Sequence, residues 1–259
     1  MMQFIVHILK RFSLALAFYL PLAFSLAFPC SAQSYFNKNV TLFSPIQTEA
    51  ARSIISADSN YVVIGSTGYT QNINLYRIAL TRLCLAGDIE QLTYIGDTVH
   101  EYYSGVGTLL KTTDNSIAFA GTVRAYGDTI DDQAAIIKFN SNLQLEWIKQ
   151  FGNTDNIIDT VNVGRGLCQT AEGNYMLTGE QYYYGDYSEF YLQKADIDGN
   201  CIWRQTYWFG GVNSGFSVIA TTDGGYAMGG YRYYPGPNVE VDPLVVKTDS
   251  LGNLEWYAD

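Results

Sequence analysis

The sequence predicts an all-β fold, and three observations lead to it: a repeated motif, short runs rich in Val, Ile, Tyr and Phe, and no helical periodicity beyond the N-terminal segment. Each repeat has an apolar run that stops at a glycine, and these glycines recur every 51 to 58 residues, at Gly65, Gly121, Gly179 and Gly230. Four short strands per unit at this period are typical of a β-propeller blade. We therefore expect a β-propeller of four-stranded antiparallel blades, with four repeats visible.

A second set of anchors supports the same repeat. A basic residue lies further along each repeat, after the anchor glycine and the loop, at Arg82, Lys138, Lys194 and Lys247. Nine residues further on lies Gln91, Trp147, Trp203 or Trp256, and we expect the tryptophan to pack between neighbouring blades. In the second repeat the expected strands are 106–112, 116–123, 133–139 and 143–151. The predicted blades span about 50–96, 105–152, 162–210 and 213–256.

The last repeat, "TDGGYAMGG" followed by "VVKTDSLGNLEW", resembles the blade repeat of secreted bacterial β-propeller proteins. Many of those proteins carry a C-terminal sorting domain for type IX secretion. The resemblance covers 50–256 and implies export and a propeller, with little about chemistry. This chain departs from the pattern because it shows no sorting domain, and it stops at Asp259 before the "FG" pair that closes earlier repeats.

That ending leaves two alternatives for the ring. The favoured expectation is an incomplete propeller, in which these repeats are a piece of a longer chain. The other is closure of the ring by the segment 39–43, which would complete the last blade.

Residues 1–32 are predicted to be a signal peptide. Lys10 and Arg11 precede an apolar run at 12–28, and small residues at 30–32 provide a cleavage site. A membrane anchor is the competing interpretation, but the run is short for a span and contains Pro21. We expect a mature chain of 33–259 that is secreted or displayed at the cell surface, with no membrane insertion after cleavage.

The composition excludes several partners. The chain has 25 acidic and 15 basic residues and a formal net charge of −10, which argues against nucleic acid and against an anionic membrane surface. Three cysteines follow the signal, Cys84, Cys168 and Cys201, at spacings that match no metal site. We interpret them as small buried hydrophobic residues. No cofactor is predicted.

The loops that follow the anchor glycines are rich in tyrosine and should emerge on one face of the ring. One interpretation is that these tyrosines are ordinary strand-forming residues flanking turns. The other is a face of aromatic rings and carboxylates that binds a carbohydrate or protein ligand. The candidate ligand-binding residues are Tyr126, Asp128, Tyr182, Tyr184, Asp186, Tyr233 and Tyr234.

Other motifs carry weaker signals. Asp196, Asp198 and Asn200 alternate as in the start of a calcium loop, but they fall at a predicted hairpin, so a turn is the first interpretation and a calcium site the second. His100 is the single histidine after the signal, and no nucleophile-elbow motif is present. Carboxylates are available for glycoside chemistry, at Asp131, Asp132, Asp186, Glu189 and Glu240.

These observations predict a non-catalytic binding or display module outside the cell, and no catalytic residue is assigned. The alternative is a carboxylate-dependent, glycan-active enzyme, either a hydrolase or a lyase. Turnover of a polysaccharide panel would separate the two.

Overall fold

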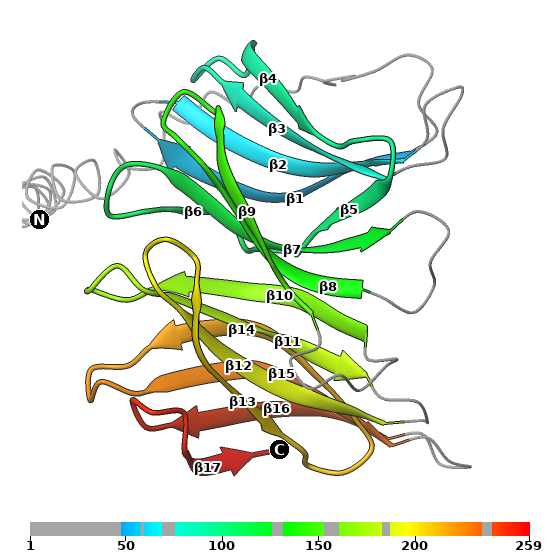
Figure 1. The fold of residues 1–259 in the computed structure, drawn as a ribbon, viewed down its shortest axis with the longest axis vertical. Coiled ribbons are helices and arrows are strands. Elements are labelled where there is room, and N and C mark those ends of the chain that lie inside the picture. Colours follow the sequence, from blue (N-terminus) through cyan, green and yellow to red (C-terminus); the bar gives the residue numbers. More distant parts are fainter. Residues whose placement is uncertain are drawn as a thin grey trace, which may run out of the picture. The chain divides into compact units, whose positions relative to one another are not determined.

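The computed structural model describes residues 48–57, 60–68, 76–125, 132–152, 161–182, 187–234 and 240–259 (Figure 1). The chain divides into two compact units, Met1–Val40 and Thr41–Asp259, and all described residues belong to the second. Every regular element among them is a β-strand. The predicted signal peptide lies outside the described residues, so its assignment stays a prediction.

The strands form four successive antiparallel meanders, which we call the first to fourth blades. The first blade contains β1 (Thr48–Ala57), β2 (Asn60–Gly68), β3 (Arg77–Leu83) and β4 (Ile89–Ile95). The second contains β5 (His100–Ser104), β6 (Leu110–Lys111), β7 (Ile117–Ala125), β8 (Asp132–Phe139) and β9 (Leu145–Phe151). The third contains β10 (Val161–Gln169), β11 (Tyr175–Tyr182), β12 (Ser188–Ala195) and β13 (Cys201–Tyr207). The fourth contains β14 (Val212–Ala220), β15 (Tyr226–Tyr234), β16 (Glu240–Thr248) and β17 (Leu254–Ala258).

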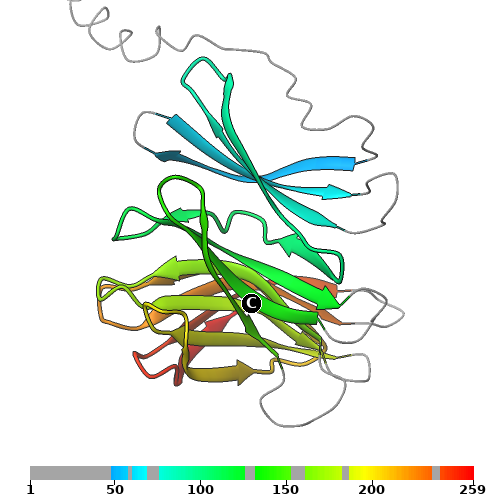
Figure 2. The ribbon, with the colours of Figure 1, turned by 45° about the horizontal axis from the view of Figure 1, so that its top comes forward.

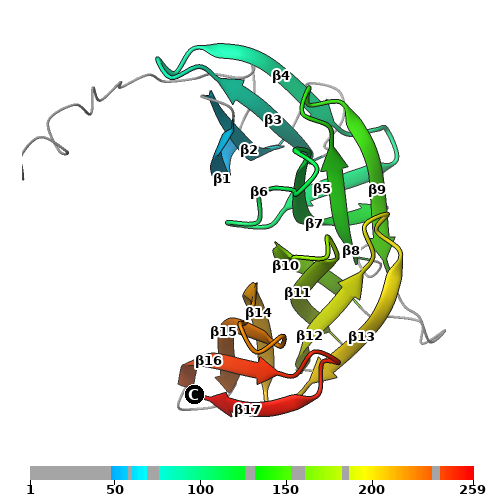
Figure 3. The ribbon, with the colours of Figure 1, turned by 90° about the vertical axis from the view of Figure 1, so that its left-hand side faces the viewer.

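Each blade pairs its strands in chain order, and the blades follow one another along the chain (Figures 2 and 3). A single parallel bridge, Ser188 with Val212, links the third blade to the fourth. Among the described strands, none of the fourth blade pairs with the first. The predicted all-β architecture of four-stranded antiparallel blades is therefore present, without a closed ring of strand pairing in the part of the chain that is described.

The second blade departs from the strand predicted at 106–112. Its first strand is split into β5 and β6, and β6 is only Leu110–Lys111. Between them the Gly105 N–H donates to Ala120 O at 2.9 Å, and Gly107 adopts a positive φ of 73°. The other blades have a β-bulge at this place, for example between Gly164 and Gly166. The prediction missed the break because a bulge leaves little trace in residue periodicity.

Glycine is required at three of the anchor positions because the first strand of the same blade approaches them closely. A Cβ at Gly179 would lie 1.8 Å from Val163 O, and one at Gly230 would lie 1.9 Å from Ser214 O. At Gly121 the distance to Tyr103 O would be 2.5 Å. The repeat therefore keeps glycine where two backbones approach closely.

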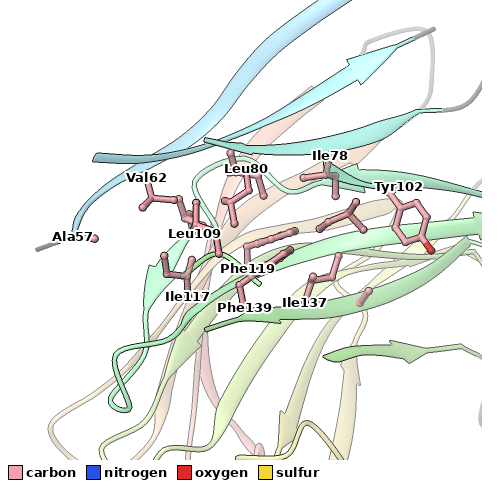
Figure 4. Close-up of a cluster of buried hydrophobic side chains, with 14 of the residues drawn as sticks. Ala57, Val62, Ile78, Leu80, Tyr102, Leu109, Ile117, Phe119, Ile137 and Phe139 are labelled. Atoms are coloured by element: carbon pink, nitrogen blue, oxygen red, sulfur yellow. The ribbon is translucent and has the colours of Figure 1, made fainter. Parts of the chain in front are cut away.

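The core lies between successive blades. Phe119, Ile137 and Phe139 of the second blade pack with Val62 and Leu80 of the first (Figure 4). A second cluster joins the second blade to the third, and another joins the third to the fourth. Trp147 packs edge-on against Tyr175 of the next blade, with ring centroids 5.8 Å apart, and Trp203 lies 6.2 Å from Tyr226. The expectation that the repeated tryptophan packs between blades agrees with these contacts.

No helix in the described residues is long and apolar enough to span a membrane.

Candidate functional site

Three of the seven candidate residues of the predicted tyrosine face belong to the described part of the chain. Tyr126, Asp128, Tyr184 and Asp186 lie outside the described residues, so their roles stay predictions. Tyr182 ends β11, and Tyr233 and Tyr234 end β15.

Tyr234 has a structural task within the fourth blade. Its hydroxyl donates to Phe209 O at 3.1 Å, and the Arg232 guanidinium lies 4.8 Å from its ring centroid. Arg232 also pairs with Asp242 at 3.2 Å and with Asp259. These contacts occupy the polar groups of Tyr234 inside the blade, although the side chain remains half-buried.

Tyr182 lies beside a buried carboxylate, that of Glu180. Burial raises the pKa of its hydroxyl, and the nearby charge of Glu180, the hydroxyl of Tyr231 and a hydrogen bond to Glu180 raise it further. Glu180 stands two residues earlier on β11 and is completely buried. A buried carboxylate is rare in proteins unless it is paired, so its surroundings need an explanation.

Arg165 of β10 is the partner of that carboxylate. Its Nε donates to Glu180 Oε1 at 3.0 Å, and a terminal guanidinium nitrogen donates to the same oxygen. Glu180 Oε2 is buried and has no hydrogen-bond partner among the described residues. One carboxylate oxygen therefore receives both guanidinium donors while Oε2 receives neither, and the Tyr182 hydroxyl is the polar group that approaches the Glu180 carboxylate from the same strand.

Two aromatic rings complete the group. The Arg165 guanidinium lies 5.1 Å from the ring centroid of Phe216 on β14, and the rings of Phe216 and Tyr231 are 5.5 Å apart. Phe216 is exposed, and Arg165 and Tyr231 are half-buried. We call this group, Arg165, Glu180, Tyr182, Phe216 and Tyr231, the carboxylate–aromatic cluster. It combines a carboxylate that has a free acceptor, a cation and apolar rings at the junction of two blades.

The third blade is the one that carries a charged residue at this register position. The residue after the anchor glycine differs in every blade and is Ser66, Thr122, Glu180 or Tyr231. Sequence reasoning could have found Glu180 by comparing this register position, but it searched the loops instead.

A second arginine–carboxylate pair provides a contrast. Arg124 and Asp132 in the second blade join through both carboxylate oxygens, with a guanidinium nitrogen 2.6 Å from Oδ2. The Arg124 guanidinium also lies 5.6 Å from the ring of Tyr103. This pair is satisfied internally, so Asp132, a carboxylate considered for glycoside chemistry, is better explained as structural.

The weak calcium candidate is a hairpin turn. Asp196 Oδ1 accepts from the backbone N–H groups of Asp198 and Asn200, at 3.0 and 2.7 Å, and Asn200 Nδ2 donates to Oδ2 at 2.9 Å. Asp249 makes the same bonds to Leu251 and Asn253. No group of three or more His, Cys, Asp or Glu side chains suited to a metal occurs in the described residues.

His100 and the cysteines make local contacts or none. His100 Nδ1 lies 2.8 Å from Asp97 Oδ2, an oxygen that also accepts from the Tyr102 hydroxyl at 2.9 Å. Burial would raise the pKa of Asp97, but these hydrogen bonds and those from the Val99 and His100 backbone lower it to about 2. The three cysteines in the described residues are free, and the exposed Cys201 departs from the expectation that all are buried.

The comparisons with known proteins bear on the fold. No family model and no curated protein sequence matches this chain. The structure is similar to a thermostable family-43 glycoside hydrolase, with a TM-score of 0.51 and 12% identity over 78% of this chain and 73% of that one. A protein of unknown function from Dyadobacter fermentans DSM 18053 has a TM-score of 0.51 and 7% identity, covering 80% of this chain and 62% of that one. An endo-arabinase from Bacteroides thetaiotaomicron VPI-5482 has a TM-score of 0.46 and 10% identity, covering 75% of this chain and 73% of that one.

The similarity to the family-43 glycoside hydrolase, together with the blade topology, confirms the predicted β-propeller fold and corrects the predicted function. The favoured prediction was a non-catalytic binding or display module, with an enzyme as the less favoured alternative. The finding that contradicts it is the similarity in fold to the family-43 glycoside hydrolase, which is named as an enzyme acting on glycosides. At 12% identity the likeness extends to the fold alone, so the activity of this chain is argued from its own residues.

Proposed function

We propose that this chain is a carboxylate-dependent, glycan-active enzyme whose substrate contacts the carboxylate–aromatic cluster. The observation that carries the proposal is the unpartnered oxygen of Glu180. A buried acceptor without a partner costs on the order of 1–3 kcal/mol, so such an atom in a folded protein calls for a functional or a solvent-based explanation. Because Glu180 is fully buried, a substrate hydroxyl would reach Oε2 after a half-buried neighbour such as Tyr182 moves aside, and donating to Oε2 would then remove that cost.

The neighbours of Glu180 suit a sugar. Aromatic rings such as Phe216 and Tyr231 offer apolar surface to the C–H face of a sugar ring, while charged side chains satisfy its hydroxyl groups. Arg165 is only half-buried, so its remaining N–H groups can donate to a substrate oxygen while Nε holds Glu180 in place. The cluster thus supplies an acceptor, donors and a stacking surface within one small region.

In the reaction, Glu180 is assigned the carboxylate role and Arg165 the positioning role. Glycoside hydrolysis uses two carboxyl groups on opposite sides of the scissile bond, and Glu180 would provide one of them. A lyase reaction would instead use a base to remove a proton from the sugar, which the same oxygen could accept. The products distinguish the two, since a lyase leaves an unsaturated sugar at the new chain end.

The proposed cellular location and export route of the enzyme rest on the sequence. The residues of 1–32 support export through a signal peptide, which puts the enzyme outside the cell, where polysaccharides are found. The "TDGGY…KTDSLGNLEW" motif supports a place among the secreted bacterial propeller repeats. Type IX secretion is the corresponding proposal for the export route, and it would require a sorting domain, which residues 33–259 do not show.

The experiment is a polysaccharide panel tested for turnover with matched variants. Glu180→Gln keeps the size of the side chain and removes its charge, and it should lower turnover by about 100-fold or more. Asp132→Asn removes a comparable buried carboxylate from the Arg124 pair, so it controls for lost stability. It should retain activity when assayed below its own melting temperature.

Two results would contradict the proposal. One is a folded wild-type protein that binds a polysaccharide in the panel without converting it. The other is a Glu180→Gln variant with the turnover of the wild type.

A further inference from the structure

The first strand of every blade is interrupted near its middle. In β1, β10 and β14 a β-bulge leaves one residue outside the strand pairing, and in the second blade the interruption is the segment between β5 and β6. A bulge redirects the side chain that it carries, and bulges are common next to active sites. We call the four residues at these interruptions the bulge residues: Arg52, Val106, Arg165 and Phe216.

The interruptions of successive blades touch one another. The Gly107 N–H of the second blade donates to Arg52 O of the first at 3.1 Å. A Cβ at Gly105 would lie 2.9 Å from Arg165 O of the third blade, and the Arg165 guanidinium lies 5.1 Å from the ring centroid of Phe216 in the fourth. Figure 3 shows the first strands β1, β6, β10 and β14 in this order. All of these contacts lie at junctions between described blades, so they do not depend on what precedes β1 or follows β17.

The side chains of the bulge residues reach solvent. Val106 is 60% exposed and Phe216 is 41% exposed. Arg52 is exposed, and the Arg165 side chain is 33% exposed even though its partner Glu180 is completely buried. This line of accessible side chains extends the carboxylate–aromatic cluster beyond the third blade, toward the first. A polymer that lies along it would contact more of the protein than the sugar unit at Glu180 does.

Arg52 sets the chemistry of the far end of the line. It takes the same bulge position as Arg165. The residue after the anchor glycine of its blade is Ser66, where the third blade has Glu180. None of the described carboxylates forms an ion pair with Arg52. Its guanidinium is therefore available to an anionic group of a ligand, whereas the charge of Arg165 is already balanced.

We propose that the line of bulge residues binds consecutive units of an acidic polysaccharide, with the carboxylate of a uronate unit on Arg52. The inference rests on the proposed function, because it takes the cluster around Glu180 as the place where the glycan reacts. Arginine binds a carboxylate through two parallel N–H groups, and Val106 offers apolar surface to the sugar unit in between. The chain is acidic overall, so the attraction has to be local, and the four bulge positions carry two cations and no carboxylate.

The test compares each acidic polysaccharide with its own neutral form. The probes are polygalacturonate, alginate and hyaluronate, and chemical reduction of their carboxyl groups gives neutral polymers with the same backbones. At least one of the three should bind the wild-type protein about 10-fold or more tightly than its reduced form does, because reduction removes a charge-assisted hydrogen bond. Calorimetry measures the affinities, and chromatography of the products measures turnover.

Substitutions of Arg52 then assign the preference to one side chain. Arg52→Gln removes the charge and should remove the preference, while the affinity for the reduced polymer stays unchanged. Arg52→Lys keeps the charge without the paired N–H groups and should keep part of the preference. Lys149→Gln is the matched control, because it removes a cation from the outer strand β9, where Lys149 Nζ donates to Asn200 Oδ1 at 3.0 Å. It should keep the full preference.

Binding and turnover are read separately. Turnover of a polysaccharide by a protein that binds acidic and reduced forms equally would overturn this inference and leave the enzyme standing. A preference for an acidic form that depends on Arg52, without turnover, would support the binding line and contradict only the enzyme. An Arg52→Gln variant that keeps the preference would overturn the inference, and so would a wild type that binds none of the three acidic polysaccharides.

Discussion

The third and fourth blades are built from the same repeat, but they differ in how their faces are used. In the third blade the middle strands are buried on both faces, with Met176 and Leu192 packed against the fourth blade and Leu177 and Tyr191 against the second. In the fourth blade Met228 and Val246 are buried, while Val245 and the whole of β17 are exposed. The comparison therefore distinguishes residues that form the structure of a single blade from residues that pack one blade against the next.

The largest effect should come from residues that shape the blade, and it should be equal in both. Gly179→Ala and Gly230→Ala each place a Cβ within 2 Å of a backbone oxygen, at 1.8 and 1.9 Å, so each should destabilise the fold by about 3 kcal/mol or more. Gly229→Ala is the control, because its nearest neighbour is the Ser217 hydroxyl at 3.0 Å. It should change stability by less than about 1 kcal/mol.

Urea unfolding measures these three variants. If Gly230→Ala cost far less than Gly179→Ala, the fourth blade would not have the tight strand approach that the repeat implies, and the comparison would fail.

Residues that join blades should behave differently in the two. Trp203→Ala removes a ring that packs on Tyr226 and should cost about 2–4 kcal/mol. Trp256→Ala should cost less than about 1 kcal/mol, because Trp256 is 51% exposed and packs on no further blade among the described residues. Equal losses from the two substitutions would mean that Trp256 stabilises its own blade instead.

The same separation explains what the sequence could predict. The anchor glycines and the tryptophans recur at fixed positions, so comparing repeats was enough to predict blades and packing between them. Glu180 was missed because the residue after the anchor glycine differs in every blade, so the repeat does not mark that position. The split of β5 from β6 depends on a local backbone path, which the identities of Gly105 and Gly107 do not specify. The function was predicted wrongly because a shared repeat carries no information about chemistry.

A smaller effect should appear in the ionisation of the turns. Hydrogen bonds from Thr221, Lys247 and the Gly225 backbone hold the pKa of Asp223 well below its usual 3.8. In the third blade, the pKa of Glu172 is lowered first by its hydrogen bond with Thr170, and Lys194 contributes least. Lys247→Met should therefore raise the pKa of Asp223 clearly, while Lys194→Met should raise that of Glu172 only slightly.

Carboxyl NMR titration measures both values. The sign for stability follows from the lowered pKa: the contribution of Asp223 is complete above its usual pKa of 3.8 and is lost as the pH falls below it. If Lys194→Met raised the pKa of Glu172 as much as Lys247→Met raised that of Asp223, a lysine–carboxylate ion pair would stabilise both turns equally.

The smallest effect concerns one turn residue that differs between blades. Asn115 has a φ of 63°, whereas the matching residues in the third and fourth blades are Gly173 and Gly224, with φ of 87° and 85°. Asn115→Gly should stabilise the protein by a few tenths and up to about 1 kcal/mol, because glycine adopts this conformation without strain. The reverse change, Gly224→Asn, meets no atom within 4 Å, so its loss should report backbone strain alone. Thermal unfolding of both variants would test this, and a gain from Gly224→Asn would mean that backbone strain does not decide the residue at this turn.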